Sequence, residues 1–205
     1  MAGGARECRS ARFLTLYRAN GAGNQMHRDL YFVLTGAMGS GKSAISEQLI
    51  NMRLKCVPEP ARQILHEQRA ISARGVPEID SDLFTQLMLS RATSFYLENF
   101  AAETLTVFDR GIPDMIAYAE LFGLDSKIYY NSANHYKYNH CVFWFEGWKD
   151  IYKKDDERKV NFQQAYAFGE RAYEIYRELG YDVIQVPMFS IDKRAEFMYN
   201  KIQSL

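Results

Sequence analysis

The chain has 205 residues, of which 25 are basic, 25 are acidic and 47% are hydrophobic. This length suits one domain with a sizeable core, and the balanced charge gives no electrostatic reason to expect nucleic acid or an anionic membrane as the main partner. No apolar run reaches the roughly 18 residues that a membrane helix needs. The cysteines are odd in number and scattered, which fits a reducing cytosol. We therefore expect a cytoplasmic protein with no nucleic-acid or membrane partner.

The N-terminal stretch up to about Gln25 differs in composition from the rest of the chain. Its charged residues are four arginines and one acid: Arg6, Glu7, Arg9, Arg12 and Arg18. A mitochondrial-type presequence has a similar composition, but a disordered extension or an upstream start codon, with Met26 as the true start, also explains it. We exclude residues 1–25 from the fold, and we divide the chain into an extension or mis-assigned start over 1–27 and one folded domain over 28–205.

Five short apolar segments have the composition of buried strands, and turn residues separate them from helical patterns. The expected strands cover residues 30–35, 54–57, 105–108, 141–145 and 183–186. The expected helices run from about 42 to 52, over 61–71, from an N-cap at Asp80 or Ser81, between Pro113 and Gly123, over 163–179 and over 191–202. Because strands alternate with helices, the fold class is α/β, with a parallel sheet covered by helices on both faces.

Residues 36–43 match the pattern G-x-x-x-x-G-K-[ST] in full. Glycines in such a loop let the backbone curl and point successive N–H groups at phosphate oxygens, and the following helix adds its positive N-terminal end. The expected strand before the loop and the expected helix after it supply the context of a P-loop. The predicted nucleotide-binding residues are Gly36, Ala37, Met38, Gly39, Ser40, Gly41, Lys42 and Ser43.

Two of these loop residues have a specific task, and a second acidic position completes the pattern. Lys42 reaches the β- and γ-phosphates, and the hydroxyl of Ser43 joins the Mg²⁺ shell. Asp109 ends a predicted strand, where a carboxylate can orient Mg²⁺ or accept a proton from an acceptor hydroxyl. Its neighbour Arg110 is suited to grip a phosphate or an anionic acceptor, whereas ATPases that activate water usually carry a second carboxylate there. The predicted cofactors are therefore ATP and Mg²⁺, with transfer to a bound molecule favoured over transfer to water.

Several segments of the chain carry a family resemblance: TGAMGSGKS, VPEPARQIL, VFDRGIPDMIAYAELFGL, DDERK and GYDVIQVP. They resemble the small P-loop, AAA-type ATP-binding family typified by the ribosylnicotinamide kinase domain of NAD-biosynthesis regulators, in its branch of predicted ATPases or kinases. The resemblance covers nearly all of the chain after residue 28. It implies a P-loop NTPase fold with a five-stranded parallel sheet in the order 2-3-1-4-5, flanked by helices, and a helical lid at about 148–162. It does not name the acceptor.

The resemblance also suggests residues for the acceptor side. In similar nucleoside kinases, a Glu-Pro after the second strand presents its carboxylate to the acceptor hydroxyl, and Glu59 stands at this place. Glu59 is thus a candidate general base or acceptor clamp, with Asp109 as the competing base and a charge at a helix N-terminus as the alternative role. Arg62 and Arg110 are candidates for binding the acceptor, and Arg158 matches the lid arginine that stabilises charge on the transferred phosphoryl group. The catalytic candidates are Lys42, Glu59, Asp109, Arg110 and Arg158, and the metal candidates are Ser43 and Asp109.

Four tyrosines could stack on the ring of a ligand: Tyr118, Tyr129, Tyr130 and Tyr138. Aromatic side chains at helical spacing more often belong to the core, so we do not assign them to the site.

The leading hypothesis is a small-molecule kinase that transfers the γ-phosphate of Mg-ATP to a nucleoside, nucleotide or similar metabolite. The chain lacks the N/T-K-x-D tetrapeptide with which GTPases read guanine, which favours ATP. Two alternatives stay open: a non-catalytic, nucleotide-dependent switch that binds a partner, and a simple ATPase.

Overall fold

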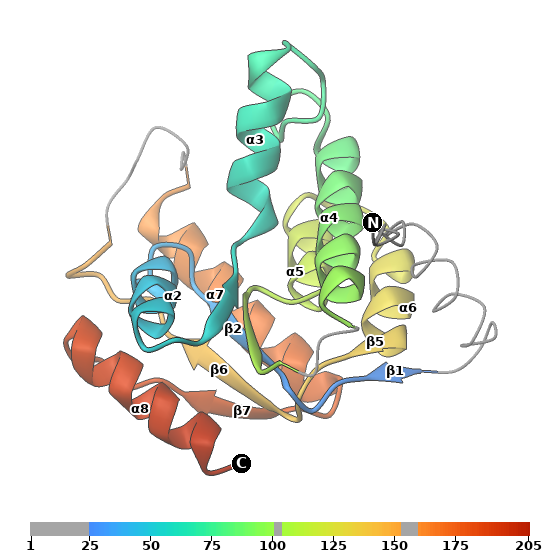
Figure 1. Cartoon of the computed structure of the whole chain (residues 1–205). Helices are drawn as coiled ribbons and strands as arrows, with labels where there is room; N and C mark the ends of the chain where they lie inside the picture. The colour runs from blue at the N-terminus through green and yellow to red at the C-terminus, as the bar shows by residue number, and fades with distance from the viewer. Residues whose placement is uncertain (1–24, 101–103, 153–159) are drawn as a thin grey trace, which may run out of the picture.

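A computed structural model of the protein describes residues 25–100, 104–152 and 160–205. Its centre is a five-stranded sheet with helices on both faces (Figure 1). The strands are β2 (Tyr31–Gly36), β3 (Lys55–Val57), β4 (Thr106–Asp109), β6 (Cys141–Phe145) and β7 (Asp182–Gln185). Neighbouring strands are parallel, in the order β3-β4-β2-β6-β7. Counted within this sheet alone the order is 2-3-1-4-5, so the predicted fold class and strand order are confirmed.

The helices follow the predicted positions with one addition. They are α2 (Lys42–Asn51), α3 (Pro60–Ala70), α4 (Ser81–Asn99), α5 (Asp114–Leu121), α6 (Lys127–His135), α7 (Phe162–Glu178) and α8 (Ile191–Gln203). Asp80 is the N-cap of α4, where its carboxylate accepts a hydrogen bond of 3.0 Å from the amide of Leu83. Helix α6 was not predicted. Within the described residues, no helix is both long and apolar enough to cross a membrane.

Strand β2 divides the core into two halves because its successive side chains point to opposite faces of the sheet. Tyr31 and Val33 join the cluster formed with α4, α5 and α7, whereas Phe32 and Leu34 join a second cluster with α2 and α8. All six residues of β2 are buried. The phosphate loop, which begins at Gly36, is therefore anchored on a fully buried strand.

A second, two-stranded sheet lies beside the main one. Its strands are β1 (Met26–His27) and β5 (Tyr136–Lys137), which pair in parallel. The hydroxyl of Tyr96 lies 2.9 Å from the carbonyl oxygen of Met26 and 2.8 Å from that of Lys137, and so links the two strands. Met26 and His27, which the sequence division placed in the extension, are thus part of the fold. The rest of that extension, up to residue 24, lies outside the described residues.

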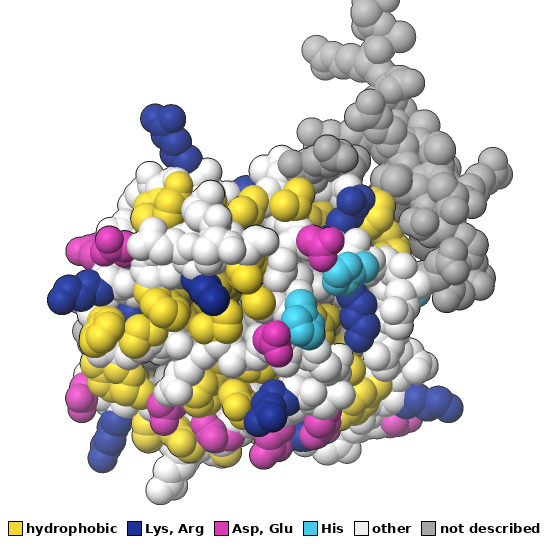
Figure 2. All heavy atoms as spheres, turned by 90° about the horizontal axis from the view of Figure 1, so that it is seen from below, with side chains coloured by type: hydrophobic (Ala, Val, Ile, Leu, Met, Phe, Trp, Pro, Cys, Tyr) yellow, Lys and Arg dark blue, Asp and Glu magenta, His cyan; other side chains and the backbone are white. Residues whose placement is uncertain are grey.

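One face of the molecule is shown in space-filling form in Figure 2. Basic and acidic side chains are interspersed there among hydrophobic ones. Over the whole sequence the formal charge is zero.

Candidate nucleotide and acceptor site

The phosphate loop joins β2 to α2 at the carboxyl edge of the sheet. Its backbone enters the left-handed region, with φ of 117° at Gly36, 76° at Gly39 and 91° at Gly41. A Cβ atom at Gly36 would lie 2.1 Å from the carbonyl oxygen of Phe145, so no side chain fits where the loop leaves the sheet. Among the described residues, the amides of 38–41 donate no backbone–backbone hydrogen bond. The loop therefore presents N–H groups that can bind phosphate oxygens.

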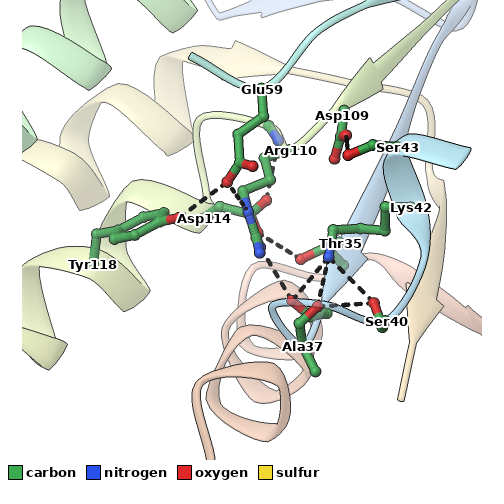
Figure 3. A network of polar contacts seen from close by, with 12 residues as sticks. Thr35, Ala37, Ser40, Lys42, Ser43, Glu59, Asp109, Arg110, Asp114 and Tyr118 are labelled. Carbon is green, nitrogen blue, oxygen red and sulfur yellow. Dashed lines mark hydrogen bonds and ion pairs between the residues drawn. The ribbon is translucent and has the colours of Figure 1, made fainter. Parts of the chain in front are cut away.

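The ammonium group of Lys42 folds back over this loop. Its Nζ lies 2.6 Å from the carbonyl oxygen of Ala37, 3.3 Å from Oγ of Ser40 and 3.5 Å from the carbonyl oxygen of Gly36 (Figure 3). Burial lowers the pKa of Lys42 to about 7, and the positive charge of Arg110 adds to this effect. A bound phosphate would favour the charged ammonium and relieve the cost of burying it.

Asp109 has a carboxylate that could bind a metal ion. It is buried at the end of β4, and its Oδ2 accepts a hydrogen bond of 3.2 Å from Oγ of Ser43. Its Oδ1 is buried and has no hydrogen-bond partner among the described residues. Burial, followed by the charge of Glu59, raises the pKa of Asp109 to about 6. An unpartnered carboxylate oxygen beside a serine hydroxyl fits Mg²⁺, which prefers oxygen ligands and keeps several waters and phosphate oxygens in its shell.

Arg110 lies at the centre of a buried ion-pair network. Its φ of 70° is unusual for a residue other than glycine, and its side chain is 1% exposed. The Nε atom donates to Oε1 of Glu59 at 2.7 Å, and Nη1 donates to Oδ1 of Asp114 at 2.8 Å and to the carbonyl oxygen of Gly36 at 3.1 Å. Because these partners come from the start of α3, from α5 and from the phosphate loop, Arg110 ties the three elements together (Figure 3).

Asp114 supports Arg110 from the first turn of α5, and the sequence analysis did not identify it. It is fully buried and also accepts hydrogen bonds from the hydroxyl of Thr35 at 2.7 Å, the amide of Gly111 at 3.0 Å and the hydroxyl of Tyr176 at 2.8 Å. These bonds account for both carboxylate oxygens, so the guanidinium is held by a partner that is itself fixed.

Tyr118 also lines the site, whereas its helical spacing predicted a place in the core. Its hydroxyl donates to Oε1 of Glu59 at 3.0 Å. Asp114 and Tyr118 are four residues apart in α5, which places them on the same side of the helix, and Arg110 precedes Asp114 by four residues just before the helix. This spacing is the sequence signal that could have identified both missing residues. Tyr129 and Tyr138, by contrast, are buried in the core as expected.

The network stabilises the ionised form of Glu59. Burial alone would raise the pKa of this carboxyl, but the charges of Arg110 and Lys42 outweigh burial, and the pKa is lowered. For Arg110, burial acts to lower the pKa, yet Tyr118 and the neighbouring carboxylates outweigh it and raise the pKa well above its usual value. Glu59 and Arg110 therefore form a permanently charged, mutually compensated ion pair.

Two cavities meet at Glu59. The larger, of about 620 Å³, is lined by Lys42, Ser43 and Asp109. The smaller, of about 190 Å³, lies among α3, α4 and α5, and Leu65, Phe84, Tyr118 and Phe122 are among its lining residues. Glu59 and Arg62 line both cavities.

The structure thus brings most of the predicted residues together. The loop from Gly36 to Ser43, Glu59, Arg62, Asp109 and Arg110 surround the two cavities or contact the residues that do. Arg158 lies outside the described residues, as do residues 153–159 of the predicted lid.

A second buried arginine reaches the loop from the far end of the chain, and the sequence analysis missed it. Arg194, on the first turn of α8, donates from Nη1 to the carbonyl oxygen of Ser40 at 3.0 Å. Burial lowers its pKa. No local pattern marks this residue, because the contact spans 154 positions of sequence.

A comparison with protein families decides the affiliation. Residues 31–194 match a family described as an AAA domain. The chain belongs to this family. The match extends from β2 to the first turn of α8, and so includes the phosphate loop, the Glu59–Arg110 network and Arg194. A search of curated proteins finds no match.

Solved structures of kinases share the fold. Deoxyadenosine kinase from M. mycoides, with dCMP and dCDP bound, has a TM-score of 0.64 at 15% identity, covering 85% of this chain and all (100%) of the kinase. NadR in complex with NR has a TM-score of 0.60 at 13% identity over 85% of this chain, which spans only 50% of the NadR chain. Thymidylate kinase from Ehrlichia chaffeensis has a TM-score of 0.57 at 16% identity, covering 85% and 98% of the two chains. The fold is therefore that of P-loop kinases, but the sequence identities are too low to indicate which substrate this chain binds.

Proposed function

We propose that the protein is a kinase that transfers the γ-phosphate of Mg-ATP to a hydroxyl group of a small metabolite. The observation that carries this proposal is the position of Glu59. Its carboxylate is held by Arg110 where a cavity beside the phosphate loop meets a second, largely apolar cavity. A hydrolytic ATPase needs no second cavity at this point, whereas a kinase needs a place for the acceptor.

Residues of the phosphate loop and its surroundings would hold the nucleotide. The loop amides and Lys42 bind the β- and γ-phosphates, while Ser43 and Asp109 hold Mg²⁺. The metal ion, when bound, neutralises part of the phosphate charge. In the transfer, the acceptor oxygen bonds to the γ-phosphorus as the bond from that phosphorus to the β–γ bridging oxygen breaks, and ADP leaves. The proton of the acceptor hydroxyl passes to a carboxylate.

We assign that carboxylate to Glu59, although Asp109 has the higher pKa. Glu59 lines both cavities, whereas Asp109 lines only the larger one. Asp109 is also engaged with Ser43 and has the unpartnered oxygen that fits the metal. Arg110 then acts on the reaction by fixing Glu59, and Arg62, which lines both cavities, contacts the acceptor. Arg158 is proposed to close over the triphosphate from the lid.

The lining of the smaller cavity favours an uncharged acceptor with a flat ring, such as a nucleoside. Its walls include the apolar side chains of Leu65, Phe84 and Phe122. Two of its arginines already face carboxylates: Arg69 lies 3.0 Å from Glu78, and Arg110 is bonded to Glu59 and Asp114. A phosphate-bearing acceptor would have to compete with these pairs.

The test is phosphate transfer from Mg-ATP across matched pairs of nucleosides and nucleoside monophosphates. We expect transfer to a nucleoside, lowered by roughly 100- to 1,000-fold in both Lys42→Ala and Glu59→Gln. Tight Mg-ATP binding without turnover across the panel would contradict the kinase and support a nucleotide-dependent switch. Phosphate release that does not depend on any acceptor would support a simple ATPase.

A further inference from the structure

Arg194 contacts the phosphate loop from the side opposite to the acceptor network. Its Nη1 donates to the carbonyl oxygen of Ser40 at 3.0 Å. A Cβ atom at Gly41 would lie 2.5 Å from its Nη2, so the guanidinium is packed directly against the loop at Gly41. Ser40 and Gly41 immediately precede Lys42. The guanidinium thus supports the turn that aims the loop.

The surroundings of this guanidinium are aromatic. Its central carbon lies 5.6 Å from the ring centre of Phe145 and 5.6 Å from that of Trp148. The residue is 4% exposed. Aromatic rings attract a cation, but they do not neutralise its charge.

The positive charge has no acidic partner within the part of the chain that the structure describes. No carboxylate there acts on the charge of Arg194, and its Nε is buried without a hydrogen-bond partner. Burial is also the cause of its lowered pKa. Arg110, which is equally buried, has two carboxylates and a carbonyl.

A buried cation without a partner destabilises a fold, because water is lost and no anion replaces it. If Arg194 only fastened α8 to the loop, an apolar side chain of similar length would fill the space at lower cost. An anion bound nearby would offset the free-energy cost of burying this charge. The phosphate loop is the place where a polyphosphate would bind.

We propose that Arg194 is a positioning residue of the nucleotide site, a buried cation that stabilises a polyphosphate bound in the loop. It orients the Ser40–Gly41 turn through the carbonyl oxygen. Its charge, which no carboxylate of the described residues neutralises, attracts the anion through the loop. The proposal rests on the proposed binding of Mg-ATP, but it is independent of transfer to an acceptor.

The experiment measures the affinity for Mg-ATP by calorimetry and the unfolding temperature without nucleotide in four variants. Arg194→Met removes the charge and the donor, Arg194→Gln keeps a neutral donor, and Arg194→Lys keeps a charge. Lys193→Met removes the same charge from an exposed position one residue away and is the matched control. We expect about tenfold weaker binding in Arg194→Met and Arg194→Gln, a smaller loss in Arg194→Lys and none in Lys193→Met.

The decisive result is that Arg194→Met weakens Mg-ATP binding without lowering the stability of the free protein. Without nucleotide, Arg194→Met should unfold at the same temperature as the parent protein or at a higher one. If Arg194→Met and Arg194→Gln bind Mg-ATP as tightly as the parent protein, the proposal is wrong while nucleotide binding stands. If Lys193→Met weakens binding as much as Arg194→Met, a general surface charge explains the effect and the proposal is again wrong. A parent protein that binds no Mg-ATP overturns the proposed function as well.

Should Arg194→Met fail to fold, Arg194→Gln and Arg194→Lys still separate charge from hydrogen bonding. Tighter binding by the lysine variant than by the glutamine variant supports the proposal, and equal binding overturns it.

Discussion

Buried charges are neutralised on one side of the phosphate loop, around Arg110, and largely left without neutralising partners on the other, around Lys42 and Arg194. On the acceptor side, Arg110, Glu59 and Asp114 compensate one another, so burial of each charge is offset by its neighbours. On the nucleotide side, burial disfavours the charged forms of Lys42 and Asp109 and lowers the pKa of Arg194.

This difference distinguishes charged groups that the protein itself neutralises from charged groups that only a bound ligand would neutralise. A compensated network is rigid and keeps its geometry whether or not anything is bound. Uncompensated charges destabilise the free protein, and a ligand of the right charge removes that cost on binding. Stability and nucleotide affinity should therefore change together on the acceptor side and in opposite directions on the nucleotide side.

The largest effect on stability is expected from Arg110→Met. The change leaves the buried carboxylates of Glu59 and Asp114 without their cation, which costs about 3–5 kcal/mol of unfolding free energy. Urea denaturation at neutral pH without nucleotide measures this loss. The same substitution at Arg194 serves as the comparison, and equal losses from the two variants would contradict the division between the two sides.

Asp109→Asn should stabilise the free protein at neutral and alkaline pH. Because the pKa of Asp109 is raised to about 6 in the folded state, the folded protein binds this proton more tightly than the unfolded chain does. Protonation of Asp109 therefore stabilises the fold below the ordinary pKa of the group, and this stabilisation is lost as pH rises through 6. Asparagine carries no charge, so we expect a gain of about 2–3 kcal/mol at pH 8 that vanishes near pH 4. Thermal unfolding against pH in the presence of a chelator checks this. A variant that is less stable at every pH would show that the carboxylate is needed structurally.

Gly169→Ala tests the contact between α7 and the loop. A Cβ atom at Gly169 would lie 2.6 Å from the amide nitrogen of Ala37, so the helix or the loop has to move, at a cost of about 1–3 kcal/mol. Alanine is otherwise the better helix residue by about 1 kcal/mol. The reverse change at an exposed position of the same helix, Ala167→Gly, measures that propensity alone. A stabilised Gly169→Ala protein with unchanged Mg-ATP affinity would refute the contact.

Tyr118→Phe is the mildest of these changes. It removes one hydrogen bond to Glu59, worth about 1 kcal/mol, and leaves the ring in place. Because that bond helps to lower the pKa of Glu59, the acid limb of the pH profile of kcat/KM should move to higher pH. An acid limb that stays in place would mean that Glu59 is not the proton acceptor.

Most of the fold was predictable because its elements carry strong local signals. The strands of the main sheet are short apolar runs that end at glycine, proline or charged residues. Helix α6 was missed because its sequence is rich in Asn, Ser and Tyr and buries only Tyr129 and Ala133. Strands β1 and β5 have two residues each, and Tyr96 from a distant helix links them. Tertiary contacts, which no local pattern reports, determine these elements.

Site residues that lie close together in the sequence were predictable, whereas those brought together only by folding were not. The phosphate loop is one contiguous motif, and Asp109-Arg110 is one dipeptide next to a strand. Asp114 and Tyr118 were within reach through their spacing, but only the structure shows that both converge on Arg110 and Glu59. Arg194 had no signal, because its importance depends on having no acid nearby among the described residues, which only the folded arrangement reveals.

The support of the loop by α7 and α8 has a consequence for synthesis. The ribosome synthesises the P-loop before Gly169 and Arg194, which pack against the loop from helices further along the chain. A nascent chain can therefore contain the complete P-loop motif before α7 and α8, which pack against the loop, have been synthesised. ATP can therefore assist folding fully only after α8 has docked, so a product truncated before α8 should bind nucleotide more weakly despite an intact motif.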